Sequence, residues 1–406
     1  MKALIAIVTI LGAVSALQAQ VAPEGISPRK LSVSGTLFYA AQYSQMASFY
    51  SNGGNSQMTN ISGNFGYSTT SQRHPTSISL GAGDSWTISG AEYNSGPYES
   101  LALTQGFVGE YWSLQLSDGV SYFKGVPFSE PNTSSTAPES VVTLSTTTVN
   151  NNTSAECGYK LGASMSLSAG GGWSQIYYPN GGGINTYGVT ANVGLTRRLD
   201  ARDSLVGQYA YFQYSYASSG IDVYAETVTG GWSRTWSRHV TTSIAAGPQW
   251  VSSSDSSLLP SSTGVSANAS ISYSTKFGAA LLSYAHSLTG GGGYMYGAET
   301  DTVTGNFTRQ FGHRPQSQIS LALSGGYSRS SSLVLQSVPG TINGVLQTKY
   351  GTAQAGRHLG RLLSISANYT ATDQTDPQAS TPVFNGLWQS VSLGIGFTPP
   401  QIHLRH

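Results

Sequence analysis

The stretch "NTYGVTANVGLTR", residues Asn185 to Arg197, alternates large apolar residues with small or hydroxyl-bearing ones. A period of two is typical of a β-strand with one apolar face, because successive side chains of a strand point to opposite sides. One face carries Tyr187, Val189, Ala191, Val193 and Leu195, and the other carries Thr186, Gly188, Thr190, Asn192, Gly194 and Thr196. The stretch therefore predicts a long strand with an apolar face and a neutral polar face.

The same alternation recurs along the chain, and no sustained helical stripe of apolar residues interrupts it. It is clear in "GVSANASISYST" (Gly264 to Thr275) and in Leu387 to Phe397, where Gln389 breaks the apolar face. In "SLVGQYAYFQYSY" (Ser204 to Tyr216) aromatic residues fall on both faces, so the orientation of that strand stays open. The pattern predicts an all-β chain.

We expect eighteen strands. Sixteen is the alternative, because the segments between 76 and 122 are the least regular. The predicted ranges are 31–46, 58–70, 76–91, 99–108, 111–122, 145–159, 165–177, 185–197, 204–217, 222–235, 240–252, 264–275, 279–290, 294–309, 316–330, 343–356, 362–373 and 386–398.

A short basic-aromatic motif recurs between these strands at hairpin spacing. It centres on an apolar residue with a basic residue close before it, as in Arg234-Thr235-Trp236-Ser237 and Arg309-Gln310-Phe311-Gly312. The connections at the other ends of the strands are long and uneven, and the longest lies around 124–145. The repeat predicts a series of hairpins with tight turns at one end and long loops at the other.

The composition argues against a soluble globule. Only 9% of the 406 residues are charged, while 49 are Gly and 24 are Tyr; soluble proteins average roughly 25% charged residues. A net charge of +1 gives no argument for a nucleic-acid partner. The single cysteine, Cys157, excludes an internal disulfide or a cysteine-based metal cluster.

The first twenty residues, "MKALIAIVTILGAVSALQAQ", predict a cleaved secretory signal in residues 1–19, with Lys2 before a short apolar run. The alternative, a membrane anchor, needs a longer apolar run of roughly 20 residues. We expect residues 20–30 to be a short periplasmic segment, 31–398 the barrel, and 399–406 a periplasmic tail.

These features together predict a transmembrane antiparallel up-and-down β-barrel. Lipid covers the apolar face of each strand, and closure of the sheet satisfies every backbone N–H and C=O group. Alternating segments with short turns at one end and long loops at the other are typical of outer-membrane barrels. Outer-membrane lipid is then a partner, and the aromatics expected at the membrane interface are Trp232, Trp236, Trp250 and Phe311.

The hairpin unit that ends in "SRTWSR" (Ser233 to Arg238) or "TRQFG" (Thr308 to Gly312), after a secretory signal, resembles bacterial outer-membrane β-barrel porins. The resemblance covers roughly 145–398 and is to the group associated with exopolysaccharide secretion. It implies insertion by the barrel assembly machinery, and polysaccharide export components as partners. One departure is that Phe397 does not end the chain but precedes "TPPQIHLRH", so "LGIGF" is the candidate assembly signal.

Basic residues gather at the predicted tight turns. One interpretation is a basic inner mouth that attracts anionic solutes. The favoured alternative is that these charges lie at the turns because a charge costs free energy within the lipid. At the turns they contact water and can also pair with lipid head groups. The predicted rim comprises Lys160, Arg197, Arg198, Arg234, Arg238, Lys276, Arg309, Arg314, Arg357 and Arg361.

Catalysis is not expected. His74, His239, His313 and His358 fall at tight turns without carboxylate and nucleophile partners, and no HxH or HExxH spacing occurs. We expect no catalytic residue, no metal and no cofactor. The function predicted instead is an outer-membrane channel for hydrated solutes or polysaccharide, because barrels of 16–18 strands enclose an aqueous channel. The alternative is a structural or adhesive barrel that acts through its extracellular loops.

Overall fold

The computed structural model describes residues 29–44, 54–69, 71–90, 96–124, 147–217, 219–291, 295–312, 318–334, 344–360, 362–376, 385–398 and 402–404. The predicted signal segment 1–19 lies outside these residues, as does nearly all of the predicted segment 20–30 and of the long loop around 124–145. No helix in the described part of the chain is long and apolar enough to cross a membrane.

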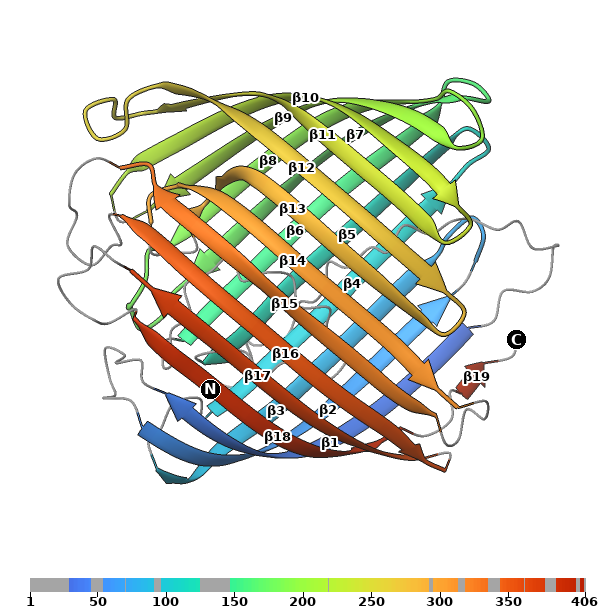
Figure 1. Cartoon of the computed structure of the whole chain (residues 1–406), viewed down its shortest axis with the longest axis vertical. Coiled ribbons are helices and arrows are strands. Elements are labelled where there is room, and N and C mark those ends of the chain that lie inside the picture. Colours follow the sequence, from blue (N-terminus) through green and yellow to red (C-terminus); the bar gives the residue numbers. More distant parts are fainter. Residues whose placement is uncertain are drawn as a thin grey trace.

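The regular elements are nineteen β-strands (Figure 1). They are β1 (Arg29–Ser44), β2 (Gly54–Thr69), β3 (Thr76–Gly90), β4 (Gly96–Val108), β5 (Trp112–Lys124), β6 (Thr147–Lys160), β7 (Met165–Tyr177), β8 (Thr186–Arg198), β9 (Asp203–Tyr216), β10 (Ile221–Ser237), β11 (Val240–Ser253), β12 (Ser262–Thr275), β13 (Gly278–Thr289), β14 (Ala298–Phe311), β15 (Ile319–Ser332), β16 (Val345–Leu359), β17 (Leu363–Thr375), β18 (Gly386–Phe397) and β19 (Ile402–Leu404).

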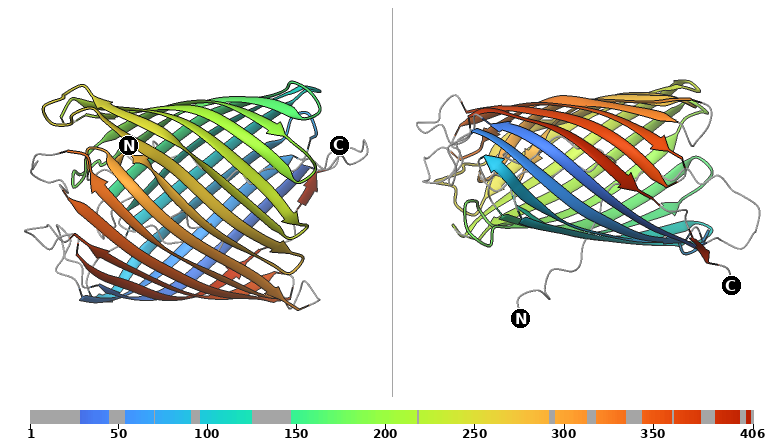
Figure 2. Two further views of the ribbon diagram at one scale, coloured as in Figure 1. Left: turned by 45° about the horizontal axis from the view of Figure 1, so that its top comes forward. Right: turned by 90° about the horizontal axis from the view of Figure 1, so that it is seen from below.

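Each of the first seventeen strands pairs antiparallel with the next, and β18 pairs with β1 to close the barrel (Figure 2). The closing register joins Gly35 to Phe397 and Ser44 to Trp388. The short strand β19 pairs with Arg29 to Leu31 and so covers the part of β1 that extends beyond β18. The segment expected to be a tail therefore contains a strand that completes the seam.

The prediction of an eighteen-stranded all-β barrel is confirmed, including β3, β4 and β5 in the least regular region. Each predicted strand boundary lies within four residues of the observed one. The repeat also placed the two ends correctly: only Arg238 and His239 connect β10 to β11, whereas residues 333–344 connect β15 to β16. We call these two ends of the barrel the short-turn end and the long-loop end.

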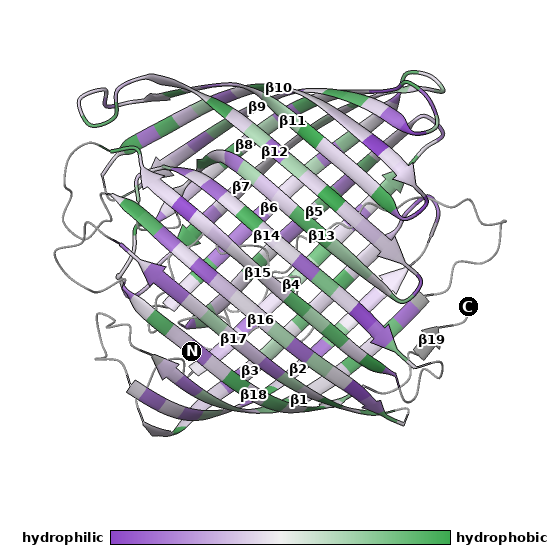
Figure 3. Cartoon of the chain, in the orientation of Figure 1, coloured by the Kyte–Doolittle hydropathy of each residue, from purple (hydrophilic) through white to green (hydrophobic). Residues whose placement is uncertain are grey.

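Alternation along each strand separates an outer from an inner face (Figure 3). In β18 the side chains of Val391, Leu393 and Ile395 are exposed on the convex side, whereas Ser390 and Ser392 are buried on the concave side. Because register pairs share a face, this assignment extends around the closed sheet through the strand pairings. The outer face is a belt of Leu, Ile, Val and aromatic residues.

Candidate functional site

The candidate site is the inner wall of the barrel, where hydroxyl groups pair across neighbouring strands. The oxygens of Ser117 and Ser154 are 2.6 Å apart, as are those of Ser204 and Ser233. Further pairs join Ser243 to Ser270 at 2.8 Å, Ser283 to Thr304 at 2.5 Å, Ser324 to Thr352, and Thr36 to Ser62. Cross-strand hydroxyl pairs stabilise a sheet modestly. Here they also coat the wall with neutral donors and acceptors.

Charge is scarce on this wall. Among the described strand residues, the acidic and basic side chains on inward positions are Lys30, Glu156, Lys160, Arg198 and His358. All of these except Glu156 lie within two residues of the short-turn end of their strand. Glu156 lies four residues inside β6, between Ser154 and Gly158 on the same face. It is the one described acid on the inner wall away from the barrel ends.

The sequence interpretation missed Glu156, although a signal was present. In "VNNNTSAECGYK" (Val149 to Lys160) the face opposite Val149, Ala155 and Tyr159 holds Asn150, Asn152, Ser154 and Glu156. The two-residue side-chain period of a strand places Glu156 on the same face as these neutral polar residues.

Several aromatic rings lie flat against the inner wall because a glycine faces them on the neighbouring strand. A Cβ on Gly83 would collide with the ring of Tyr98, and one on Gly326 would collide with Tyr350. The hydroxyl of Tyr98 donates to Asn60 Oδ1 at 3.2 Å. Glycine at these positions lets a large ring take little of the lumen's width.

At the long-loop end, loop residues pack against the inner wall and form an apolar cluster. The wall side comprises Tyr216, Ile221, Val223, Ala225 and Val251, and the loop side comprises Ile184, Leu259, Tyr296 and Val334; Leu288, near the end of β13, also belongs to the cluster. The rings of Tyr216 and Tyr296 meet edge to face at 5.0 Å between centroids, and Tyr216 Oη donates to the Gly290 carbonyl at 3.2 Å. The cluster narrows the lumen beside β9 to β11.

This cluster explains the strand whose orientation the sequence left open. Phe212, Tyr214 and Tyr216 of β9 point inward to the cluster, whereas Tyr209 points outward beside Val193 and Val228. Aromatics occupy both faces because one face meets lipid and the other meets folded loops. The residue pattern of one strand does not distinguish a face that contacts lipid from a face that contacts folded loops, because both are apolar.

The structure places eight of the ten predicted basic residues at the short-turn end; Arg314 and Arg361 lie outside the described residues. Arg197, Arg234, Arg309 and Arg357 lie on the outer face. Arg357, for example, is in register with Ile319 and Ile365, two exposed outer-face residues. Lys160 and Arg198 fall on inward positions, and Arg238 and Lys276 lie in turns. A basic inner mouth stays a prediction, but these four arginines do not form it.

The outer basic residues stack on the predicted interface aromatics. The guanidinium of Arg234 lies 4.6 Å from the ring centre of Trp236 and 3.6 Å from Asp203 Oδ2, and Trp232 Nε1 donates to Asp203 Oδ1 at 3.0 Å. Arg309 lies 5.1 Å from the ring of Phe311. Cation–π contacts of this kind hold a positive charge beside the face of an aromatic ring. Trp250 lies on the outer face nearer the long-loop end, in register with Glu226.

A cluster of one histidine, two acids and a tyrosine lies on the outer face near the long-loop end, and the sequence analysis did not predict it. His286 Nδ1 is 2.8 Å from Asp301 Oδ1 and Nε2 is 3.0 Å from Glu299 Oε1, while Tyr284 Oη donates to Asp301 at 2.9 Å. Both ring nitrogens face carboxylates, so neither is aimed at a hydroxyl or thiol nucleophile. These residues come together only through the register of β13 with β14.

The other histidines are placed as follows. His74 packs its ring edge to face on Phe107, His239 Nδ1 is 2.8 Å from the Ser274 carbonyl oxygen, and His358 is on an inward position of β16. His313 lies outside the described residues. No group of three His, Cys, Asp or Glu side chains in the described ranges is suited to a metal ion.

Comparison with known proteins gives no family model that matches the chain and no matching curated protein. Solved structures are similar at low identity. OccK5 (OpdH) of Pseudomonas aeruginosa has a TM-score of 0.48 and 12% identity, covering 92% of this chain and 98% of its own. OpdK of the same organism, solved with vanillate, has a TM-score of 0.46 and 8% identity, covering 92% and 99%. A bacterial polysaccharide outer-membrane secretin has a TM-score of 0.37 and 8% identity, covering 91% and 98%. At these scores the likeness carries no argument about function, which must come from the barrel itself.

Proposed function

We propose that this protein is a bacterial outer-membrane porin that passes uncharged, hydrated, polyhydroxylated solutes. The observation that carries the proposal is the inner wall, where paired Ser and Thr hydroxyls go around the barrel and Glu156 is the only described acid away from the ends. Such a wall exchanges hydrogen bonds with a sugar that sheds part of its water. It offers no ring of charge to select ions.

The membrane location follows from the outer face. A belt of exposed Leu, Ile, Val and aromatic side chains would be costly in water, and the pairing of β1 with β18 closes the described sheet, as a sheet in lipid requires. Cleavage of the signal segment 1–19 and insertion by the barrel assembly machinery are part of the proposal. Outer-membrane barrels have their short turns on the periplasmic side, so the short-turn end of this barrel faces the periplasm in our proposal.

The cargo class extends to polysaccharide. A neutral hydroxyl wall suits a free oligosaccharide and a passing polysaccharide chain equally, because both present the same hydroxyl groups. Association with polysaccharide export components rests on the family resemblance in the hairpin motif. The apolar cluster around Tyr216 and Leu259 limits the width of the path in either case.

Planar-bilayer recording of the purified protein tests the proposal. We expect stepwise conductance with weak ion selectivity, and current block by neutral oligosaccharides at concentrations at which vanillate has little effect. Ser243→Ala with Ser270→Ala removes one inward hydroxyl pair without adding bulk, so it should weaken the sugar block and keep the conductance. The control is Ser215→Ala, on the outer face of β9.

Absence of any current at all voltages would refute the open channel. If loop deletion then abolished binding of the cells to a surface, the barrel would act through its loops instead. Block by vanillate rather than sugars would keep the channel and refute the proposed cargo class.

A further inference from the structure

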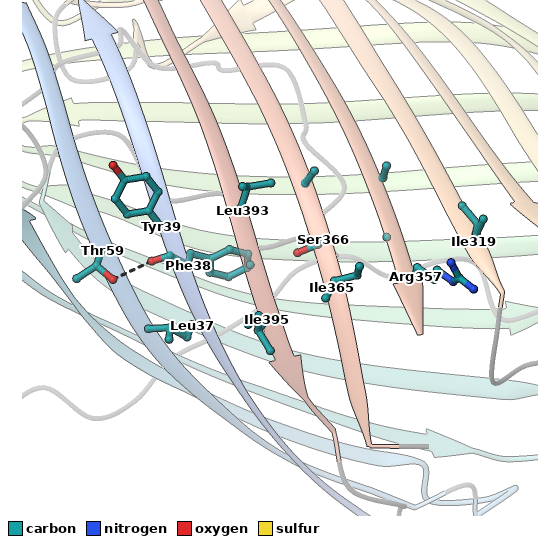
Figure 4. Close-up of a pocket in the computed structure, with 14 residues that line it drawn as sticks. Leu37, Phe38, Tyr39, Thr59, Ile319, Arg357, Ile365, Ser366, Leu393 and Ile395 are labelled. Atoms are coloured by element: carbon teal, nitrogen blue, oxygen red, sulfur yellow. Dashed lines mark hydrogen bonds between the residues drawn. The ribbon is translucent and has the colours of Figure 1, made fainter. Parts of the chain in front are cut away.

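A hollow of about 600 Å³ lies on the apolar outer face across β15 to β18 and β1 (Figure 4). The inference drawn from it rests on the proposed membrane location. Its wall includes Ile319, Ile365, Leu393 and Ile395, all exposed side chains. A concave apolar site in a lipid-facing belt needs an occupant that fills it, because unfilled space loses van der Waals contacts.

The hollow exists because two small residues lie side by side in its floor. Ala355 of β16 is in register with Ala367 of β17, and Ala367 is in register with Leu393 of β18. The next row toward the short-turn end consists of Ile319, Arg357, Ile365, Ile395 and Leu37. Large side chains therefore surround a floor of methyl groups.

Arg357 places a positive charge at the short-turn end of this hollow, two residues from Ala355 on the same face (Figure 4). Its side chain is exposed. Unlike Arg234 it has no carboxylate within 4.0 Å among the described residues, and unlike Arg309 it lies over no aromatic ring there. Among the described residues the guanidinium has no anionic partner, and it lies two residues from the short-turn end of β16, where it can bind an anion.

We propose that this groove binds one acyl chain of an anionic phospholipid, with the lipid phosphate on Arg357. We choose an anionic phospholipid because its charge and polarity match the groove. A guanidinium binds a phosphate through two parallel hydrogen bonds, and the acyl chain matches the apolar lining. A second copy of the barrel could fill the hollow with apolar side chains, but it would leave Arg357 without an anion unless it also supplied a carboxylate.

Native mass spectrometry of the full-length protein tests this, after detergent-solubilised protein is mixed with phosphatidylglycerol or phosphatidylethanolamine at equal concentration. Both lipids carry the phosphate, but the ammonium group of phosphatidylethanolamine offsets its charge and is repelled by Arg357. We therefore expect retained phosphatidylglycerol to exceed phosphatidylethanolamine by about tenfold. Arg357→Gln should remove the preference, and Ala355→Leu should reduce retention of both lipids. Matched controls are Arg309→Gln, outside the groove, and Ala269→Leu, on the outer face of β12.

Equal loss in the variants and their controls would refute the site, since it would show only general lipid coating. Conversion of an oligomer to a monomer by Ala355→Leu would also refute it and assign the groove to a second copy. Conductance separates this inference from the porin proposal: normal current without lipid preference overturns the groove alone, and lipid preference without current overturns the porin alone.

Discussion

The ring of Phe38 lies directly over Gly394 across the seam where β1 and β18 close the barrel. The two residues are register partners, and a Cβ on Gly394 would occupy the space of the ring. Phe38 is 5% exposed, so the ring has little room to move aside. The packing of Phe38 at the β1–β18 seam therefore depends on one glycine.

We expect Gly394→Val to destabilise the barrel by about 1–3 kcal/mol, because overpacking forces the ring off its position. Urea unfolding in detergent micelles measures the change. Adding Phe38→Ala should recover part of the loss, since the two residues contact each other and their effects do not add. Gly230→Val is the control, because open space surrounds that glycine. Additive effects in the double variant would contradict the seam contact.

Leu259→Ala should widen the path at the long-loop end. Leu259 is 2% exposed inside the cluster formed with Tyr216 and Val223. Truncating a buried leucine costs about 2–5 kcal/mol of packing, enough to release a loop from the wall. Single-channel recording should show larger current with more noise. Leu281→Ala, on an inward but exposed position of β13, is the control; equal currents in the wild type and Leu259→Ala would contradict a constriction here.

Glu156→Gln should shift ion selectivity toward anions. No other acid lies on an inward strand position in the described ranges. The basic side chains there lie at the short-turn end and are Lys30, Lys160, Arg198 and His358. Removing the acid therefore leaves a weakly positive path. The reversal potential in a salt gradient measures the shift. Glu226→Gln, on the outer face, should leave it unchanged; a shift of the same size in both variants would show that Glu156 does not face the permeating ions.

Asp118→Asn should stabilise the protein in lipid. Asp118 lies on the outer face, six residues from Trp112 along β5, and accepts a hydrogen bond from Thr153 Oγ1 at 2.6 Å. A carboxylate in the apolar belt costs free energy that an amide largely avoids, about 1 kcal/mol. Unfolding from liposomes measures the gain, with Asp373→Asn near the long-loop end as a nearly neutral control. A loss of stability would indicate that protein, rather than lipid, covers this part of the barrel.

Asp200→Ala should weaken the β8–β9 turn only above acidic pH. The backbone N–H groups of Arg202 and Asp203 donate to Asp200 Oδ1, and they hold the pKa of this carboxyl below its ordinary value of 3.8. A depressed pKa contributes stability above 3.8 that is lost as the pH falls through the folded-state value. The gap in thermal midpoint between wild type and variant should be present at pH 7 and close below pH 3.8. A gap that persists at lower pH would assign the effect to turn geometry rather than charge.

The residue pattern alone predicts the strands, their two faces and the two kinds of barrel end. Alternation in stretches such as Asn185 to Arg197 fixes which side chains share a face, because the side-chain period of a strand is two. Tight turns with Arg234 and Trp236 or Arg309 and Phe311 mark where the chain reverses. These signals are local, so the eighteen strands could be predicted from them.

The folded barrel is needed to establish which residues meet across strands and what each face contacts. His286 reaches Asp301 and Glu299, and Phe38 covers Gly394, through register that one strand does not encode. Arg357 turned outward, and the aromatics of β9 met folded loops on one side. The physical reason is that a period of two specifies a face, whereas closure of the barrel and the folding of loops into it specify the neighbours.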